Sequence, residues 1–415
     1  MKAILKKVTL LGIILTGFSL YAQNRDLDNY RQPDQRGVGV FEAPKDTIST
    51  FDGVQVRVGG ASTLQFQALD HENSGAVPLA ELGSNFNLAT ANLDLDVVLY
   101  DGVRMHLRTY LSSRHHPEPY VKGGYFQIDK LDFISEGFLS DFMKHTTIKI
   151  GHMENNYGDA HFRRSDNAQA IYNPFVGNLI MDAFTTEVGA EVYYRCNSGL
   201  FGMVGFSNGK LNQSTVKNDA NGASFLAKLG YDKQISDDLR LRVTGSLYNT
   251  GSVASSYLYS ADRAGSRYYH VMEAAAATSD NFRSGRFNPN FGNKVTAIMF
   301  NPFIKYKGLE FFGTVEMADG RKHSEVDRKS ADQFAGELIY RFGQNENFYI
   351  GGRYNTVSSE DVDIKRRQFG AGWFMTKNIL MKAEYVKQTY DGYAVGNVLE
   401  DGEFNGLMLE AVISF

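Results

Sequence analysis

The chain has 415 residues, with 43 Lys and Arg against 47 Asp and Glu, 41 Gly, 8 Pro and one Cys. The lack of a basic excess argues against a nucleic-acid-binding protein, which needs positive charge to meet phosphates. The single cysteine excludes a disulfide framework and a cysteine-based zinc site. Phe and Tyr are abundant, yet no apolar run beyond the amino terminus is long enough for a membrane-spanning helix.

The amino terminus predicts export from the cytoplasm. Three lysines precede an apolar run over residues 8–20, and Ala22 supplies a small residue after it. We expect residues 1–22 to be a secretory signal peptide, because the run is too short to span a bilayer. Residues 23–53 are polar and have no sustained period, which predicts a mostly disordered periplasmic extension. The alternative is a small plug packed into a barrel mouth.

From residue 54 onward the sequence alternates with a period of two, which is typical of β-strands. The last strand divides into a lipid face and a lumen face. The lipid face holds Leu407, Leu409, Ala411, Ile413 and Phe415, and the lumen face holds Gly406, Met408, Glu410, Val412 and Ser414.

Residues 85–111 repeat this pattern on both sides of an Asp-Gly turn at 101–102. A two-residue loop would pair inward residues with outward ones, so we expect a three-residue loop with Gly102 in the left-handed conformation. In that register Asp94 lies opposite Arg108, and Asp96 lies opposite His106. Arg104 then points inward as well.

The same alternation predicts sixteen strands, beginning near residues 54, 85, 103, 123, 146, 187, 199, 224, 239, 295, 309, 332, 347, 364, 378 and 404. Links after even-numbered strands are short, except at 134–145. Links after odd-numbered strands are long, notably 154–186, 208–223, 250–294, 318–331 and 389–403. Short periplasmic turns and long extracellular loops characterise outer-membrane barrels. The sequence therefore predicts an all-β fold, a closed antiparallel transmembrane β-barrel of about 16 strands over residues 54–415.

Two segments resemble Bacteroidota porin-like outer-membrane proteins, which are distantly similar to phosphate-selective porins. They are Gly-His-Met-Glu-Asn-Asn-Tyr-Gly-Asp-Ala-His-Phe-Arg-Arg-Ser-Asp-Asn at 151–167 and Asn-Pro-Phe-Val-Gly at 173–177. The terminal Phe415, after an alternating strand, resembles the assembly signal read by the outer-membrane barrel insertion machinery. The resemblance covers residues 54–415, and it implies a porin in the bacterial outer membrane, in contact with its lipid. We match no lysine ladder like that of phosphate-selective porins.

Charged residues of the longest loops and of the wall are the candidate site. In many sixteen-stranded porins the loop after the fifth strand narrows the channel, so we expect residues 154–186 to fold inward. The alternative is an external loop that packs on neighbouring loops. The loop's candidates for the constriction are Asp159, Arg163, Arg164, Asp166 and Asp182. The inward wall candidates are Asp94, Asp96, Arg104, Arg108, Arg240 and Arg242. Inward acids and bases are nearly equal in number, which predicts weak selectivity. We expect Arg240 and Arg242 to carry any anion preference, because they have fewer acidic neighbours in the adjoining strand, where Asp232 and Lys228 offset each other. Most of these charges could instead form ion-paired ladders that only hold the wall.

Enzymatic and metal-binding functions have weaker support. Gly205-Phe-Ser207-Asn-Gly209 matches a nucleophile pattern, but it leaves a short strand without the helix that such an elbow needs. His115 and His116 have no third ligand at a useful spacing. We expect no catalytic residue, no metal and no cofactor.

The sequence thus favours a porin through which small hydrophilic solutes diffuse passively. The alternative is a structural barrel, plugged by its long loops and belonging to a larger outer-membrane assembly. The 250–294 connection is long enough to fill a lumen. A homotrimer or membership of a larger membrane complex is compatible with either.

Overall fold

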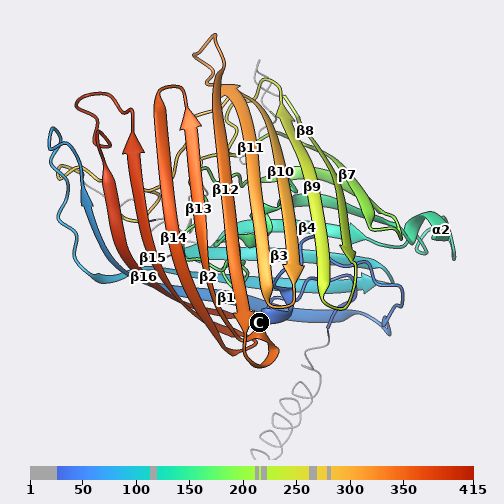
Figure 1. Ribbon diagram of the computed structural model, residues 1–415. Helices are drawn as coiled ribbons and strands as arrows, with labels where there is room; N and C mark the ends of the chain where they lie inside the picture. The colour runs from blue at the N-terminus through green and yellow to red at the C-terminus, as the bar shows by residue number, and fades with distance from the viewer. Residues whose placement is uncertain (1–25, 113–118, 211–214, 216–221, 261–268, 278–281) are drawn as a thin grey trace, which may run out of the picture.

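The computed structural model describes residues 26–112, 119–210, 215, 222–260, 269–277 and 282–415. The predicted signal peptide, residues 1–22, lies outside the described residues. The described chain forms one closed sheet in which each strand pairs antiparallel with its sequence neighbours and the last strand pairs with the first. Figure 1 shows the ring of tilted strands, with β12–β16 toward the viewer and the carboxyl terminus at the lower end. The predicted sixteen-stranded closed barrel is confirmed.

Closure leaves no strand edge without backbone partners, which is what a lipid environment demands. The strands are β1 (Gln55–Glu72), β2 (Asn85–Tyr100), β3 (Val103–Ser112), β4 (Tyr120–Ile128), β5 (Thr146–Glu154), β6 (Thr186–Arg195), β7 (Leu200–Ser207), β8 (Ser224–Gln234), β9 (Leu239–Thr250), β10 (Lys294–Tyr306), β11 (Leu309–Arg321), β12 (Lys329–Phe342), β13 (Phe348–Ser359), β14 (Val362–Thr376), β15 (Ile379–Asp391) and β16 (Glu403–Ser414).

Every strand begins within three residues of its predicted start. The largest differences are at β4 and β12, which begin three residues earlier than expected. The link that was predicted over residues 318–331 spans only residues 322–328, because β11 and β12 are longer than the sequence predicted. Between β13 and β14 only residues 360–361 remain, so one link after an odd-numbered strand is a tight turn.

The register of the β2–β3 hairpin follows the sequence prediction, although its loop does not. Asp94 pairs with Arg108 and Asp96 with His106, as expected. The loop itself holds only residues 101–102, and a bulge between Val98 and Tyr100 supplies the extra residue that keeps both faces in phase. Gly102 has a φ of +72°, the left-handed conformation that the turn requires.

The two faces of the wall differ as the dyad pattern predicts. In β16 the side chains of Leu407, Leu409 and Ile413 are exposed on the outside, whereas Met408 and Val412 are completely buried within the barrel. Leu93 and Leu99 of β2 are also exposed outward. Such an apolar outer band is typical of a barrel that faces lipid.

We call residues 26–54 the N-terminal segment. It was expected to be mostly disordered, but in the structure it packs against the barrel wall. The segment lies in the barrel end that carries the short turns, which we call the short-turn end. Gln35 N donates to Lys377 O in the β14–β15 turn, and Lys45 Nζ donates to Asp129 O after β4. Phe41 is 2% exposed between the rings of Phe303, Phe312 and Phe162. The segment thus forms the plug that the sequence left as an alternative.

Helical structure is short in the described part of the chain, where no helix is long and apolar enough to cross a membrane. α2 (Ser140–Met143) lies in the longest link of the short-turn end, between β4 and β5. The three other helical turns are η1 (Gln35–Gly37) in the N-terminal segment, η2 (Ala160–Arg163) after β5, and η3 (Gln344–Glu346) between β12 and β13.

Deleting Phe415 should lower the amount of assembled barrel. Its backbone N–H and C=O both bond to Gly60, at 3.0 Å each, so the deletion removes two hydrogen bonds from the seam between β1 and β16 together with the terminal ring. The measurement is the heat-modifiable fraction on gels of membrane extracts. Phe415→Tyr keeps the backbone and an aromatic ring and serves as the control. Normal assembly of the deletion variant would contradict the proposed role.

Candidate functional site in the barrel lumen

The loop between β5 and β6, residues 155–185, lies inside the barrel and is here called the inner loop. Nearly all of its residues are buried. Its backbone N–H groups find partners on wall side chains instead of in a sheet. Val176 N donates to Glu384 at 2.8 Å, and Ile180 N donates to Asn355 at 2.7 Å. Because buried N–H groups require partners, the polar wall determines where this loop can lie.

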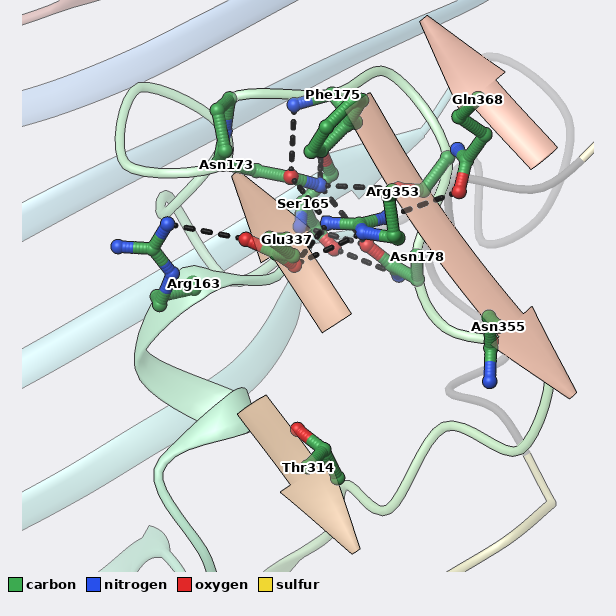
Figure 2. A network of polar contacts seen from close by, with 12 residues as sticks. Arg163, Ser165, Asn173, Phe175, Asn178, Thr314, Glu337, Arg353, Asn355 and Gln368 are labelled. Atoms are coloured by element: carbon green, nitrogen blue, oxygen red, sulfur yellow. Dashed lines mark hydrogen bonds and ion pairs between the residues drawn. The ribbon is translucent and has the colours of Figure 1, made fainter. Parts of the chain in front are cut away.

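Arg163 of the inner loop meets two wall carboxylates. Its Nη2 lies 2.7 Å from Glu310 Oε1 and 3.0 Å from Glu337 Oε2. Arg353 of β13 also reaches Glu337, at 2.8 Å, and donates to Gly177 O. Figure 2 shows Arg163 and Arg353 converging on Glu337, with the loop residue Asn173 beside Arg353. These contacts bind the loop to the β11–β13 wall.

Arg164, Asp166 and Asp182, three of the other predicted loop residues, mainly bind the loop to itself. Arg164 and Asp182 form a two-pronged ion pair with a closest approach of 2.6 Å. Asp166 lies 3.5 Å from Arg164 and 3.5 Å from Lys122 of β4. All three predicted residues are buried. They therefore hold the inner loop in its fold, and Asp166 also joins it to the wall.

The predicted wall charges on β2 and β3 are ion-paired with each other. Arg108 binds both carboxylate oxygens of Asp94, at 2.7 and 2.6 Å. Asp96 lies 2.9 Å from His106 and 3.4 Å from Arg104. This arrangement matches the expected cross-strand pairs, in which opposite charges cancel.

Four buried charges join the N-terminal segment, the inner loop and the wall, and we call them the charge cluster: Glu42, Asp159, Lys228 and Arg242. Arg242 of β9 lies 2.8 Å from Glu42 and 2.8 Å from Asp159. Lys228 of β8 lies 3.3 Å from Glu42 and 3.0 Å from Asp159. Two wall cations thus hold one carboxylate from each inserted segment.

The charge cluster corrects the expectation that Arg240 and Arg242 have few acidic neighbours. That reasoning considered only the adjoining strand. Arg242 in fact meets Glu42, Asp159 and Asp232, and Arg240 forms a two-pronged pair with Asp232 at 2.8 and 2.7 Å. Both guanidinium groups are therefore neutralised. No period or motif marks Glu42 in the sequence, so its role could not be found there.

Burial raises the pKa of the two carboxylates in the charge cluster, but the neighbouring cations lower it by more. Arg242 and Lys228 hold the pKa of Glu42 well below its ordinary value. The same two cations lower the pKa of Asp159. Both carboxylates are thus ionised at neutral pH, and this keeps them bound to the wall.

The link between β9 and β10, described over 251–260, 269–277 and 282–293, lies over the inner loop, and we call it the outer loop. Phe287 N donates to Ile180 O at 2.7 Å, and Phe184 N donates to Leu258 O at 2.8 Å. The Tyr259 hydroxyl donates to Glu316 of the wall at 2.7 Å. The described parts of this loop fill the end of the lumen opposite the short turns.

Cavities remain beside these segments. One of about 790 Å³ lies at the short-turn end, between the N-terminal segment and the wall, with Arg240 and Glu310 in its lining. Another, about 170 Å³, is lined by the N-terminal segment, the inner loop and the β3–β6 wall. Arg104 and Arg108 line this second cavity.

Ser207, which was considered for catalysis, does not line either of these two cavities. Ser207 donates to Glu187, and its hydroxyl accepts a bond from Gly209 N, which is a structural role at the end of β7. His115 and His116 lie outside the described residues. Within the described ranges, no group of three His, Cys, Asp or Glu side chains is arranged to hold a metal ion.

No protein-family model matches the chain, and no curated protein matches it. Solved structures do. The anion-selective porin from Comamonas acidovorans has a TM-score of 0.55 at 9% identity, over 87% of this chain and 100% of that one. OprB of Pseudomonas putida, in its high-pH structure, has a TM-score of 0.54 at 11% identity, over 88% and 94%. The trimer form of OmpT from Vibrio cholerae has a TM-score of 0.51 at 14% identity, over 88% and 100%.

The chain has the fold of outer-membrane porins. At identities this low the likeness concerns the arrangement of strands and not the lumen chemistry. The inserted segments and their ion pairs are features of this chain that its own structure establishes.

Replacing Arg242 by Gln should destabilise the barrel by about 3–5 kcal/mol, because it leaves buried carboxylates with too little positive charge. The midpoint of urea unfolding in detergent micelles measures the change. Lys365→Gln is the control, since its pair with Asp391 is exposed to solvent and should not move the midpoint. Equal midpoints for the two variants would show that the charge cluster is unimportant for stability.

The N-terminal segment should detach in acid. Because the folded-state pKa values of Glu42 and Asp159 lie below the unfolded values of about 4, their stabilisation is complete above that pH and is lost as pH falls through the folded values. We expect hydrogen exchange of residues 26–53 to be constant from about pH 8 to 5, after correction for intrinsic rates, and to rise below about pH 4. Glu42→Gln should weaken the pH response. Release between pH 5 and 8 would contradict this assignment.

Proposed function

We propose that the protein is a passive channel of the porin type in the bacterial outer membrane. The observation that carries this proposal is the division of the wall into an apolar outer face and a charged inner face. A Lys or Arg facing lipid at the bilayer centre costs about 2–4 kcal/mol, so charges of this number require a polar interior. Its surroundings would then be membrane lipid, and its assembly would depend on the barrel insertion machinery.

The route for solutes is narrow, because three segments occupy the lumen. The inner loop reaches from Arg108 on β3 to Glu384 on β15 and blocks a wide central pore. One space left beside it is the cavity along the β3–β6 wall. We infer that small hydrophilic solutes pass on this side, without covalent chemistry and without a cofactor.

Ion selectivity should be weak. Arg108 is paired with Asp94, Arg240 with Asp232, and Arg242 with three carboxylates. Charges compensated at such distances produce little net potential for a permeating ion. The pairing gives no support to the phosphate preference of the porins that the sequence resembles. A trimer is a further proposal, supported by the trimer form of the similarly folded OmpT.

The second candidate is a plugged structural barrel, and a specific observation favours it. The N-terminal segment, the inner loop and the described parts of the outer loop together contact the wall at both ends and in the middle of the lumen. A barrel filled in this way could support a larger assembly without conducting. The two candidates differ in whether the intact protein passes ions.

Single-channel conductance in a planar bilayer separates them. We expect small but measurable steps for the intact protein, and larger steps after residues 156–184 are replaced by a short Gly-Ser linker. The excision is geometrically mild, because Glu154 and Thr186 are already paired across β5 and β6.

Heat modifiability on gels must first confirm that the excision variant is assembled. Unchanged steps in an assembled variant would place the conducting path away from the inner loop. A silent intact protein with a conducting variant would establish the plugged barrel instead.

A further inference from the structure

The cavity along the β3–β6 wall has an unbalanced lining. Five Lys and Arg side chains border it, against three Asp and Glu. Asp94 binds Arg108, which is one of these five cations, whereas Glu42 belongs to the charge cluster and Glu154 accepts from His161 at 2.5 Å. Arg104 and Lys122 reach Asp96 at 3.4 Å and Asp166 at 3.5 Å. Among the described residues, the cations of the lining that have no carboxylate within ion-pairing distance are therefore Lys149 and Arg31.

Lys149 of β5 is the clearest case. Among the described residues its ammonium has no carboxylate within ion-pairing distance, and it lies 5.5 Å and 5.2 Å from the ring centres of Tyr125 and Tyr193. Its cross-strand neighbour Glu191 is already occupied, because it accepts from the Tyr193 hydroxyl and from Asn156 N. The rings offset part of the desolvation of Lys149 but supply no counter-charge.

Two guanidinium groups of the lining add hydrogen-bond donors that an anion could use. Arg104 of β3 is buried, and its Nε has no hydrogen-bond partner, although its other nitrogens reach Asp96 and Gln127. Within the described part of the chain, Arg31 of the N-terminal segment donates to the carbonyls of Gly37 and Phe162. Burial lowers the pKa of Arg31 to about 10, so it is still charged at neutral pH. A buried donor left unpaired is costly, and an anion would relieve that cost.

The rest of the lining favours an organic anion over an inorganic one. Met153, Phe162 and Ala43 border the same cavity and present apolar surface to it. An inorganic ion would keep water against these side chains, whereas an organic acid covers them with its own carbon atoms. Pockets that combine an apolar lining with a few placed polar groups are typical of small-molecule sites.

We propose that this cavity binds a small organic carboxylate, with the carboxylate group at Lys149 and Arg104 and the carbon body against Met153 and Phe162. The binding proposal rests on the proposed function, because the bound acid would be a solute held along the conducting route. Binding itself requires only the cavity and can be measured without conduction.

Gly123 provides a way to close the site. It borders the cavity on β4, and a Cβ added there would meet no atom closer than 3.8 Å. A larger side chain should therefore extend into the free space without a backbone clash. Gly123→Leu is accordingly a filling variant, and Lys149→Gln is a charge-removing variant that keeps a similar stem.

Titration calorimetry on the full barrel in detergent, with benzoate as the probe, tests the proposal. Benzoate should bind the intact protein, and its neutral analogue benzamide should not. Lys149→Gln should weaken benzoate binding about tenfold or more, as expected for loss of a charged hydrogen bond. Gly123→Leu should abolish it. Lys144→Gln, at an exposed lysine next to α2, should bind as the intact protein does.

Several results would overturn the proposal: no benzoate binding, equal affinity for benzamide, inorganic phosphate binding as tightly as benzoate, or unchanged benzoate affinity in both Lys149→Gln and Gly123→Leu. If the protein binds benzoate but never conducts, the proposed binding site stands and the proposed channel function is wrong. If the protein conducts but does not bind benzoate, the proposed channel function stands and the proposed binding site is wrong.

Discussion

Compensation of buried charge is the constraint on which this structure depends. A strand that crosses a membrane with alternating faces must direct every charged side chain inward, where little water is left once the lumen is filled. Each inward charge then needs a partner within the barrel. Strand neighbours provide some partners, as for Asp94 and Arg108, and the inserted segments provide the others. The wall and the contents of the lumen therefore form one electrostatic unit.

The inner loop shows how this unit is built without regular secondary structure. Its backbone groups bond to long polar side chains that rise from β12, β13 and β15, so the wall takes the place of a neighbouring strand. Three successive residues, Asp166, Asn167 and Ala168, have positive φ values, which is uncommon for residues with side chains. Contacts around them, such as Arg108 to Asn167 O, hold this conformation. The wall thus holds an irregular segment in one defined arrangement.

The fold could be predicted from the sequence, because each barrel strand shows an alternation of apolar and polar residues within its own length. Alternation depends on neighbouring residues, so the start of each strand and the Asp94–Arg108 pair could be found from local pattern alone. The charge cluster could not be found in this way. Glu42 and Arg242 are 200 positions apart in the chain, and no period relates them. The location of the N-terminal segment was missed for the same reason, since a polar stretch with few apolar residues resembles a disordered one until its partners are known.

The contacts of the N-terminal segment also constrain the order of assembly. Gln35 bonds to Asn345 across 310 positions of sequence, and Lys45 bonds beside β5 on the other side of the mouth. The segment can make both contacts at once only when the wall has curved round to bring β5 and β13 to the same rim. Residues 26–54 therefore link parts of the wall that are far apart in the sequence, and their complete set of contacts requires a closed barrel.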